Sequence, residues 1–244
     1  MSSGSIDRAT TGCKGLDKML HGGFLHGRNI LLSGGAGIGK TTLAVQFICE
    51  GARNDETSMY VTLEESKEKL YADMHELHLD IAELEKTGNF LLIGGPLAVI
   101  TQSMKNVNAN VHHLIKEIEE IVKEKNVKRL VLDSLNLFLM LLETEEERRT
   151  ALAMLCNTLS SLGVTALLLT ETKEGSLELS TYGIEEFITD GVIALYRVRQ
   201  GAKFIPGIAI KKMRGTNHDK EIRLFKITEN GVVVYPDQTM FTDI

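Results

Sequence analysis

The segment GGAGIGKT at residues 34–41 constrains the fold of this chain more than any other feature of its sequence. It matches the pattern G-x-x-x-x-G-K-[ST], which forms a loop around the phosphates of a nucleotide. Glycines lack a Cβ, so the loop backbone can bend until successive N–H groups point at phosphate oxygens. An apolar run at 29–33 precedes the loop, and a helical pattern at 41–52 follows it. The sequence therefore predicts a strand, a phosphate loop and a helix that together bind a nucleoside triphosphate.

Two side chains of this loop supply its chemistry. Lys40 is expected to reach the β- and γ-phosphates, and the Thr41 hydroxyl is expected to ligate Mg²⁺. The helix that begins near Lys40 adds a partial positive charge of about +0.5 at the same place. The predicted phosphate-binding residues of the motif are Gly35, Ala36, Gly37, Ile38, Gly39, Lys40 and Thr41.

Length and composition disfavour several classes of protein. The 244 residues contain no Pro-rich or Ser-rich linker, so we expect a single domain at 11–244 after a flexible N-terminus at 1–10. No apolar run approaches the roughly 20 residues of a membrane span, which predicts no membrane partner. A net charge of −6 disfavours a large nucleic-acid surface. Three cysteines without a C-x-x-C pair are typical of reduced thiols in a cytoplasmic protein.

Apolar runs alternate with helical patterns as far as residue 183. This alternation predicts an α/β fold in which a mostly parallel central sheet is flanked by helices. Beyond residue 183 strands follow one another without long helices, and an Asn-Gly turn at 229–231 predicts a hairpin. An antiparallel C-terminal extension is therefore expected. The expected strands lie at 29–33, 59–63, 90–93, 130–132, 166–169, 192–198, 207–212, 222–227 and 232–235, and the expected helices at 41–52, 66–78, 108–125 and 145–162.

Asp133 ends an apolar strand about 90 residues beyond the phosphate loop. In phosphate-loop enzymes an acid at this place holds Mg²⁺, usually through water, because Mg²⁺ prefers oxygen ligands and retains part of its hydration shell. An Asp at a strand end also commonly starts a turn, so the prediction depends on the presence of Lys40 and Thr41. Ser134 is a weaker candidate for the same role.

Glu64 and Glu65 follow the strand expected at 59–63, at the edge where open α/β sheets place their ligands. A carboxylate here can orient and deprotonate an attacking water. The segment 65–68 can equally start a helix, because acids are favoured at a helix N-terminus. For Glu65 these two interpretations are balanced, and Glu64 is the preferred catalytic base.

Lys212 and Arg214 alternate with Met213 at the end of an expected strand, so both point to the same side. The polar turn GTNH at 215–218 follows them. A cationic pair before such a turn fits phosphate contact, including contact across a subunit boundary, where an arginine is worth roughly 10³–10⁵ in rate. An exposed, charged strand face is the alternative that composition favours.

Five blocks of sequence around these candidates are more specific than the phosphate loop alone. They are TGCKGLDKMLHGG at 11–23, VTLEES at 61–66, LDS at 132–134, YGIEEFITD at 182–190 and KMRGTNH at 212–218. Together they resemble the KaiC-like ATPases of the RecA superfamily, over residues 11–236. The resemblance implies a RecA-like P-loop NTPase fold in a single-domain protein of archaeal type, similar to the first, ATP-hydrolysing domain of the cyanobacterial clock protein.

The resemblance further implies a ring, usually a homo-hexamer, that holds ATP and Mg²⁺ between neighbouring protomers. One protomer would contribute Gly37, Ile38, Gly39, Lys40, Thr41 and Thr42, with Glu64 as base and Asp133 near the metal. The neighbour would contribute Lys212, Arg214, Thr216 and His218. As water oriented by Glu64 attacks, Lys40, Mg²⁺ and Arg214 would stabilise the charge on the γ-phosphate.

The resemblance also bears on phosphorylation. The second domain of the clock protein carries adjacent Ser and Thr autophosphorylation sites before a Thr-Asp pair, and alignment on the pair at 189–190 places Glu186 and Phe187 there. Autokinase activity at those positions is therefore not expected. Phosphorylation of the nearby Ser180 or Thr181 is a weaker hypothesis.

The sequence is compatible with three functions. The leading one is a slow Mg²⁺-dependent ATPase whose nucleotide state controls a ring and its regulatory protein partners. The first alternative is a nucleotide-gated scaffold in which hydrolysis is incidental. The second is a recombinase-like DNA-binding protein, which the net charge disfavours and for which the sequence offers no basic-aromatic loop. An apolar stretch at 135–142 is expected to pack either at a protomer interface or in the chain's own core.

Overall fold

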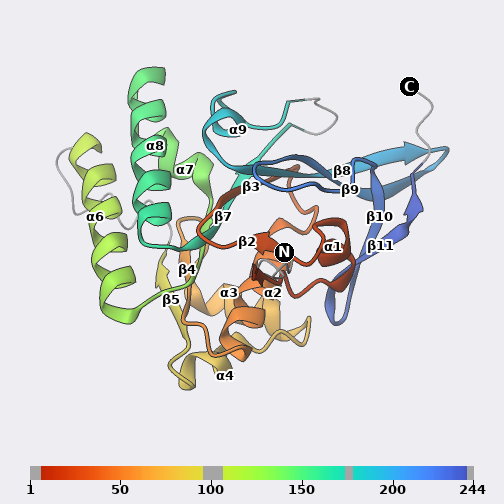
Figure 1. The fold of residues 1–244 in the computed structure, drawn as a ribbon, viewed down its shortest axis with the longest axis horizontal. Helices are drawn as coiled ribbons and strands as arrows, with labels where there is room; N and C mark the ends of the chain where they lie inside the picture. The colour runs from red at the N-terminus through yellow and green to blue at the C-terminus, as the bar shows by residue number, and fades with distance from the viewer. Residues whose placement is uncertain (1–6, 96–106, 174–177, 241–244) are drawn as a thin grey trace, which may run out of the picture.

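A mixed β-sheet forms the centre of the protein. In the computed structural model, which describes residues 7–95, 107–173 and 178–240, nine strands join in the order β11-β10-β9-β8-β3-β7-β6-β4-β5 (Figure 1). A separate ribbon pairs β1 with β2. The strands are β1 (Arg8–Ala9), β2 (Phe24–Leu25), β3 (Asn29–Gly34), β4 (Ser58–Thr62), β5 (Phe90–Gly94), β6 (Arg129–Asp133), β7 (Thr165–Glu171), β8 (Gly191–Gln200), β9 (Lys203–Met213), β10 (Arg223–Thr228) and β11 (Gly231–Thr239). The helices are α1 (Lys14–Met19), α2 (Lys40–Arg53), α3 (Lys67–His75), α4 (Ile81–Lys86), α6 (Val107–Lys125), α7 (Leu135–Met140), α8 (Glu145–Ser161) and α9 (Glu185–Ile188).

The sheet has a parallel part and an antiparallel part. β3 pairs in parallel with β7 and β8, β6 pairs in parallel with β7 and β4, and β4 with β5. From β8 onward the pairs β8–β9, β9–β10 and β10–β11 are antiparallel. The structure confirms the predicted RecA-like α/β fold, with a mostly parallel central sheet flanked by helices and an antiparallel C-terminal extension.

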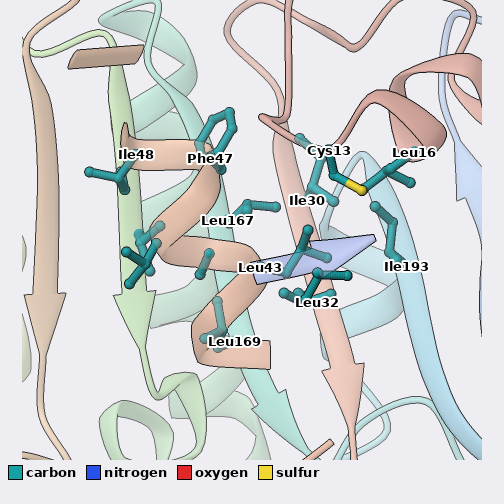
Figure 2. Close-up of a cluster of buried hydrophobic side chains, with 14 of the residues drawn as sticks. Cys13, Leu16, Ile30, Leu32, Leu43, Phe47, Ile48, Leu167, Leu169 and Ile193 are labelled. Atoms are coloured by element: carbon teal, nitrogen blue, oxygen red, sulfur yellow. The ribbon is translucent and has the colours of Figure 1, made fainter. Parts of the chain in front are cut away.

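Both faces of the central parallel strands β3, β4, β6 and β7 are buried, which explains why their sequences are mostly apolar runs. Successive side chains point to opposite faces, so Ile30 and Leu32 of β3 join the core that contains α1 and α2, whereas Leu31 joins the core that contains α6, α7 and α8. Figure 2 shows the first core, where Leu43 and Phe47 of α2 lie against the central strands. The two cores fix the strands whose ends carry the candidate site.

The C-terminal hairpin is fastened to α2. Thr228 pairs with Gly231 across the turn, which confirms the predicted hairpin. Gln46 of α2 accepts a hydrogen bond from the Val232 N–H at 2.7 Å and donates one to the Val232 carbonyl oxygen at 3.2 Å. Gly231 has a φ of 92°, and a Cβ there would lie 2.6 Å from Gln46 Cδ, so a larger residue would strain this junction. The hairpin thereby places Ile227 against the phosphate loop, where a Cβ on Gly39 would lie 2.8 Å from Ile227 Cδ1.

Four short helices of the described chain, α1, α4, α7 and α9, lie outside the elements expected from the sequence. Helices of one or two turns are too short to show a clear apolar period. α7 occupies the apolar stretch at 135–142, in which Leu135, Phe138, Leu139 and Leu142 are buried and Met140 is 59% exposed. Most of this stretch therefore packs in the chain's own core.

The N-terminal segment takes part in the fold from Arg8. Arg8 and Ala9 lie within the stretch expected to be flexible, yet they form β1, and Arg8 Nη1 donates to the carbonyl oxygens of Leu20 and Gly23 at 3.2 and 2.9 Å. Residues 1–6 lie outside the described residues, and the single domain at 11–244 stays a prediction. None of the helices in the described ranges is long and apolar enough to cross a membrane.

Candidate functional site

The carboxyl ends of four parallel strands meet at one edge of the sheet and carry the candidate site. The phosphate loop follows β3, Glu64 follows β4, Asp133 ends β6 and Glu171 ends β7. These residues line a cavity of about 440 Å³. Ligands of open α/β sheets bind at this edge.

Most of the predicted phosphate-binding residues line this cavity. From the loop and the start of α2 they are Ala36, Gly37, Gly39, Lys40, Thr41 and Thr42. Gly35 contributes a carbonyl oxygen to Lys40, and Ile38 buries its side chain in the core. The other lining residues include the predicted Glu64, Glu65 and Asp133, together with Asp73, Met74, Leu77, Glu171 and Ile227.

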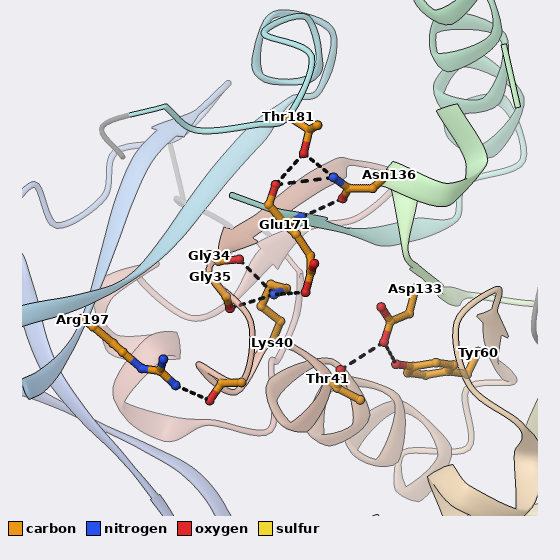
Figure 3. Close-up of polar contacts among 11 residues, drawn as sticks. Gly34, Gly35, Lys40, Thr41, Tyr60, Asp133, Asn136, Glu171, Thr181 and Arg197 are labelled. Carbon is orange, nitrogen blue, oxygen red and sulfur yellow. Dashed lines mark hydrogen bonds and ion pairs between the residues drawn. The ribbon is translucent and has the colours of Figure 1, made fainter. Parts of the chain in front are cut away.

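Lys40 is buried at the start of α2, and its ammonium group has three oxygen partners (Figure 3). Nζ donates to the carbonyl oxygens of Gly34 and Gly35 at 2.9 and 3.0 Å, and lies 3.5 Å from a carboxylate oxygen of Glu171. Gly39, with a φ of 107°, lets the chain turn directly from the loop into the helix. Lys40 therefore sits at a helix N-terminus, where free N–H groups and the helix dipole also favour phosphate oxygens.

Asp133 is buried, and two hydroxyl groups bond to its Oδ2 atom. Thr41 Oγ1 donates at 3.1 Å and Tyr60 Oη at 2.5 Å. Burial raises the pKa of the Asp133 carboxyl, and the two hydroxyl groups and Lys40 lower it in part. Burial, and then the charge of Asp133, raise the pKa of Tyr60 well above its ordinary value. Neutral hydroxyl donors therefore hold this carboxylate in place, and Lys40 is the nearby charge that lowers its pKa.

The oxygen atoms of Thr41 and Asp133 fit a magnesium ion chemically. A hydroxyl and a carboxylate are ligands of the kind that Mg²⁺ prefers, and the ion keeps several waters. Among the described residues that line the cavity, one ammonium group accompanies five carboxylates, those of Glu64, Glu65, Asp73, Asp133 and Glu171. Like charges repel, so a polyphosphate would enter this acidic cavity only together with additional cations.

Glu64 is open to water on one side and partly shielded by the cavity on the other. This partial burial raises the pKa of its carboxyl, Asp133 and Glu171 raise it further by repulsion, and Lys40 lowers it. A carboxylate with a raised pKa is a stronger proton acceptor than an ordinary glutamate. Position and electrostatics both suit a general base.

Glu65 lines the cavity and also starts a helix. Lys69 Nζ donates to Glu65 Oε1 at 2.6 Å, one turn further along the chain. Ser66 is the N-cap of α3, because its hydroxyl accepts the N–H of Lys69 at 3.3 Å. The helix-start interpretation of this segment is therefore confirmed, and a catalytic role for Glu65 stays a prediction.

Lys212 and Arg214 lie at the opposite edge of the sheet from the phosphate loop. Met213, between them, pairs with Gly191. Gly191 in turn pairs with Ile30, at the amino end of β3, whereas the loop follows the carboxyl end of that strand. The chain therefore separates two groups of residues that were both predicted to contact phosphate.

Both cations turn toward α9, which confirms that they point to the same side. Lys212 Nζ donates to the carbonyl oxygens of Glu186 and Thr189 at 2.8 and 2.6 Å. Arg214 Nη2 donates to the carbonyl oxygen of Phe187 at 3.1 Å. Burial, and then the charge of Arg214, lower the pKa of Lys212.

Thr216 and His218 follow in the same turn and stand apart from the cavity of the phosphate loop. Arg8 Nη2 donates to Thr216 Oγ1 at 2.7 Å. His218 Nδ1 lies 2.8 Å from the carbonyl oxygen of Asp219, and its side chain lines a different cavity of about 490 Å³. Neither residue therefore reaches the phosphate-loop cavity of its own chain, and their contact with a nucleotide stays a prediction.

Glu171 lines the candidate site beside Lys40, although its sequence context did not indicate it. Its N–H donates to Asn136 Oδ1 at 2.7 Å, and Thr181 Oγ1 donates to its carbonyl oxygen at 2.6 Å (Figure 3). These bonds connect the partner of Lys40 to α7 and to the segment before α9. The sequence signal for Glu171 is an acid just after the strand expected at 166–169. This signal indicates a site residue only when that strand is known to lie beside β3, which leads into the phosphate loop.

Tyr60 and Arg197 were also missed. Tyr60 is hidden inside an apolar strand, and no pattern in the sequence distinguishes it from a core residue. Arg197 of β8 donates from Nη2 to the carbonyl oxygen of Gly37, in the phosphate loop, at 3.0 Å. Its position beside the loop depends on β8 pairing with β3, which the sequence does not indicate.

The sheet, the loop between β3 and α2, and the acid at the end of β6 define the class: this is a P-loop NTPase with a RecA-like fold. The profile of the family described as "ATPase: KaiC" matches residues 9–239. The chain belongs to this KaiC-like ATPase family, and family membership implies nucleotide binding.

Individual relatives agree with this assignment. A UPF0273 protein of Aeropyrum pernix is 31% identical over 241 residues, which cover 96% of each chain. The circadian clock protein KaiC3 of Synechocystis sp. is 33% identical over 232 residues, which cover 95% of this chain and 46% of the relative, so the chain spans about half of that protein. The crystal structure of a KaiC-like protein of Pyrococcus horikoshii matches with a TM-score of 0.82 at 38% identity, covering 95% of this chain and 100% of the other.

Proposed function

We propose that this protein is a Mg²⁺-dependent ATPase whose active sites are completed between neighbouring protomers of a homo-oligomeric ring, with a hexamer as the expected form. The observation that carries the proposal is the separation of Lys40 from Lys212 and Arg214 by the length of β3. Residues 30–34 span about 13 Å at 3.3 Å per residue. In a head-to-tail ring the amino edge of one protomer meets the carboxyl edge of the next, which would supply both groups to one nucleotide.

The proposed reaction is the attack of water on the γ-phosphorus of ATP. Glu64 orients the water and accepts its proton, the bond from phosphorus to the bridging oxygen breaks, and ADP and phosphate are released. Thr41 and Asp133 would hold Mg²⁺, whose charge balances the phosphate oxygens in this acidic cavity. Lys40 from one protomer, and Lys212 and Arg214 from its neighbour, stabilise the charge on the transferred group.

The proposed role of this reaction is regulatory. The relative from Synechocystis is named a circadian clock protein, and that name supports a regulatory role. We expect slow turnover, so that each state lasts long enough for a protein partner to bind it. We place the protein in the cytoplasm because its three cysteines are buried and unpaired.

A mixing experiment tests whether the site is shared. Lys40→Ala removes the loop lysine, and Arg214→Ala removes the arginine of the other edge, so each variant alone should release little phosphate from Mg-ATP. After disassembly and reassembly of an equimolar mixture, about one quarter of the boundaries would pair an intact loop with an intact arginine edge. Recovery of about that fraction of wild-type activity is the expected result.

Two controls make the mixing result decisive. Mixing each variant with itself under the same conditions should give no recovery. Native mass measurement should show mixed rings, so that a lack of recovery cannot come from a lack of exchange. Mixed rings without recovered activity would show that each protomer has a complete site of its own, and the proposal of shared sites would be wrong.

A further inference from the structure

Arg197 stands beside the phosphate loop because β8 is longer than β3. The two strands pair in parallel as far as Gly34 and Leu195. At Gly34 the chain leaves the sheet to form the loop, whereas β8 continues to Gln200. Residues two apart in a strand share a face, so Arg197 extends from the face of Leu195, whose side chain belongs to the core that contains α2.

The contact between Arg197 and the loop is a charge-assisted hydrogen bond. Nη2 of Arg197 donates to the carbonyl oxygen of Gly37 at 3.0 Å. Gly37 has a φ of 65°, a left-handed conformation at which a residue with a Cβ would be strained. In a trans peptide the carbonyl oxygen and the following N–H point in opposite directions. When Arg197 holds the Gly37 oxygen, the N–H of Ile38 must therefore point away from Arg197, toward the opposite side of the loop.

The positive charge of Arg197 is expected to have a second effect, on the entry of a polyphosphate. The described residues lining the cavity include five carboxylates and one ammonium group, that of Lys40. Arg197 brings a guanidinium from the same protomer to the outer side of the loop, where Figure 3 shows it directed at the loop from the opposite side to Glu171. A positive charge there reduces the repulsion that a polyphosphate meets.

We propose that Arg197 is a positioning residue for the phosphate loop: it holds the Gly37 carbonyl outward before nucleotide arrives and thereby increases affinity for the triphosphate. The inference rests on the proposed function, because it assumes that the loop binds ATP. It adds a residue of the same protomer to a site whose other proposed arginine, Arg214, comes from the neighbour.

The same strand offers a matched control. Arg199 lies two residues further along β8, on the same face, and donates from Nε to the carbonyl oxygen of Gly201 in its own hairpin at 3.2 Å. Arg197→Ala and Arg199→Ala therefore remove the same charge from the same strand, but only the first removes a contact with the loop. Arg197→Lys keeps the charge on a flexible side chain that can also donate a hydrogen bond.

The test measures two quantities on full-length protein. The first is the dissociation constant of Mg-ATP, by calorimetry, for the wild type and the three variants. We expect about a five- to tenfold increase for Arg197→Ala, a change below about twofold for Arg199→Ala, and partial recovery in Arg197→Lys. The second is amide hydrogen exchange without nucleotide, which should become faster in peptides covering residues 36–40 for Arg197→Ala alone, with unchanged melting temperature.

The other outcomes distinguish a failure of the proposed function from a failure of the positioning role of Arg197. If the wild type does not bind Mg-ATP, the proposed function fails and this inference fails with it. If the wild type binds and Arg197→Ala matches it in affinity and exchange, the inference is wrong and the proposed function stands. If Arg197→Ala and Arg199→Ala weaken binding equally, a general charge effect replaces the positioning role.

Discussion

The two edges of the sheet have opposite electrostatic character. At the carboxyl edge, the described residues that line the cavity of the phosphate loop include five carboxylates and Lys40. At the amino edge, the part of the chain that the structure describes lines a cavity of about 510 Å³ with Arg28, Arg214 and His26, and with Asp190 as the acid. Asp190 lies 3.2 Å from the Arg28 guanidinium and 4.0 Å from that of Arg214, so one carboxylate serves two cations.

Because of this difference, neither edge alone has all the groups that the proposed phosphate site needs. The carboxyl edge has the phosphate loop, the proposed base and the proposed metal ligands, but it has an excess of negative charge. The amino edge has cations in excess and no phosphate loop. Complementary edges on one chain are what a head-to-tail assembly needs, because every protomer then presents both surfaces to its neighbours.

The largest expected effect is a loss of ATP turnover after a substitution at the amino edge. Arg214→Ala should lower the turnover of ATP by roughly 10³-fold or more, because an arginine at the developing charge acts mainly in the transition state. The affinity for ATP should fall by less than about tenfold, because the loop remains intact. Phosphate release at saturating Mg-ATP, together with binding by calorimetry, measures the two effects separately.

Lys211→Ala is the matched control for Arg214→Ala. Lys211 is exposed on the same strand, immediately before Lys212, and its loss should change turnover by less than about twofold. If Arg214→Ala turns over ATP like the wild type, the amino edge takes no part in catalysis, and the comparison between the edges loses its functional meaning.

Two adjacent acids at the carboxyl edge should differ in their effect. Glu64→Gln should reduce turnover by roughly 10²–10⁴ and leave ATP bound, because it removes the proton acceptor and one negative charge. Glu65→Gln should reduce turnover by less than about fivefold, because Lys69 already holds that carboxylate. Single-turnover hydrolysis of pre-bound ATP compares the two acids directly. Equal losses in both variants would contradict the assignment of Glu64 as the sole base.

The smallest expected effect is on the stability of the protein around Asp133, the proposed metal ligand. Tyr60→Phe removes the hydrogen bond to Asp133 and should lower the free energy of unfolding by about 1–3 kcal/mol at neutral pH. Burial raises the folded-state pKa of Asp133, so its ionisation costs stability as the pH rises through that pKa, and Tyr60 reduces the cost. Loss of the Tyr60 hydrogen bond raises the folded-state pKa of Asp133 further, so the deficit of the variant should grow as the pH rises from the folded pKa of the wild type to that of the variant, and stay constant outside this range.

Urea unfolding at several pH values measures this dependence. Tyr71→Phe is a suitable control, because the Tyr71 hydroxyl donates to Glu85 near the surface rather than to a buried acid. A deficit that does not change with pH would mean that the Tyr60 hydroxyl contributes to stability independently of the ionisation of Asp133.

Local patterns predicted most of the elements but few of the contacts. The strand–loop–helix unit around Lys40 could be read from residue types, because only glycines permit its backbone. The amphipathic pattern of α6 and the Asn-Gly turn before β11 are equally local signals. α7 was not predicted, because an apolar stretch such as 135–142 has the same composition whether it forms a core helix or an exposed surface.

The sequence alone determined which residues are chemically able to act: Lys40 and Thr41 by the loop pattern, Glu64 and Asp133 by their places after apolar strands. The tertiary structure decided which of them meet. The order β3-β7-β6-β4 brings Glu171 to Lys40 and Tyr60 to Asp133. The antiparallel return of β9 carries Arg214 to the other edge. Strand order depends on long-range packing between distant segments, and no local pattern encodes it.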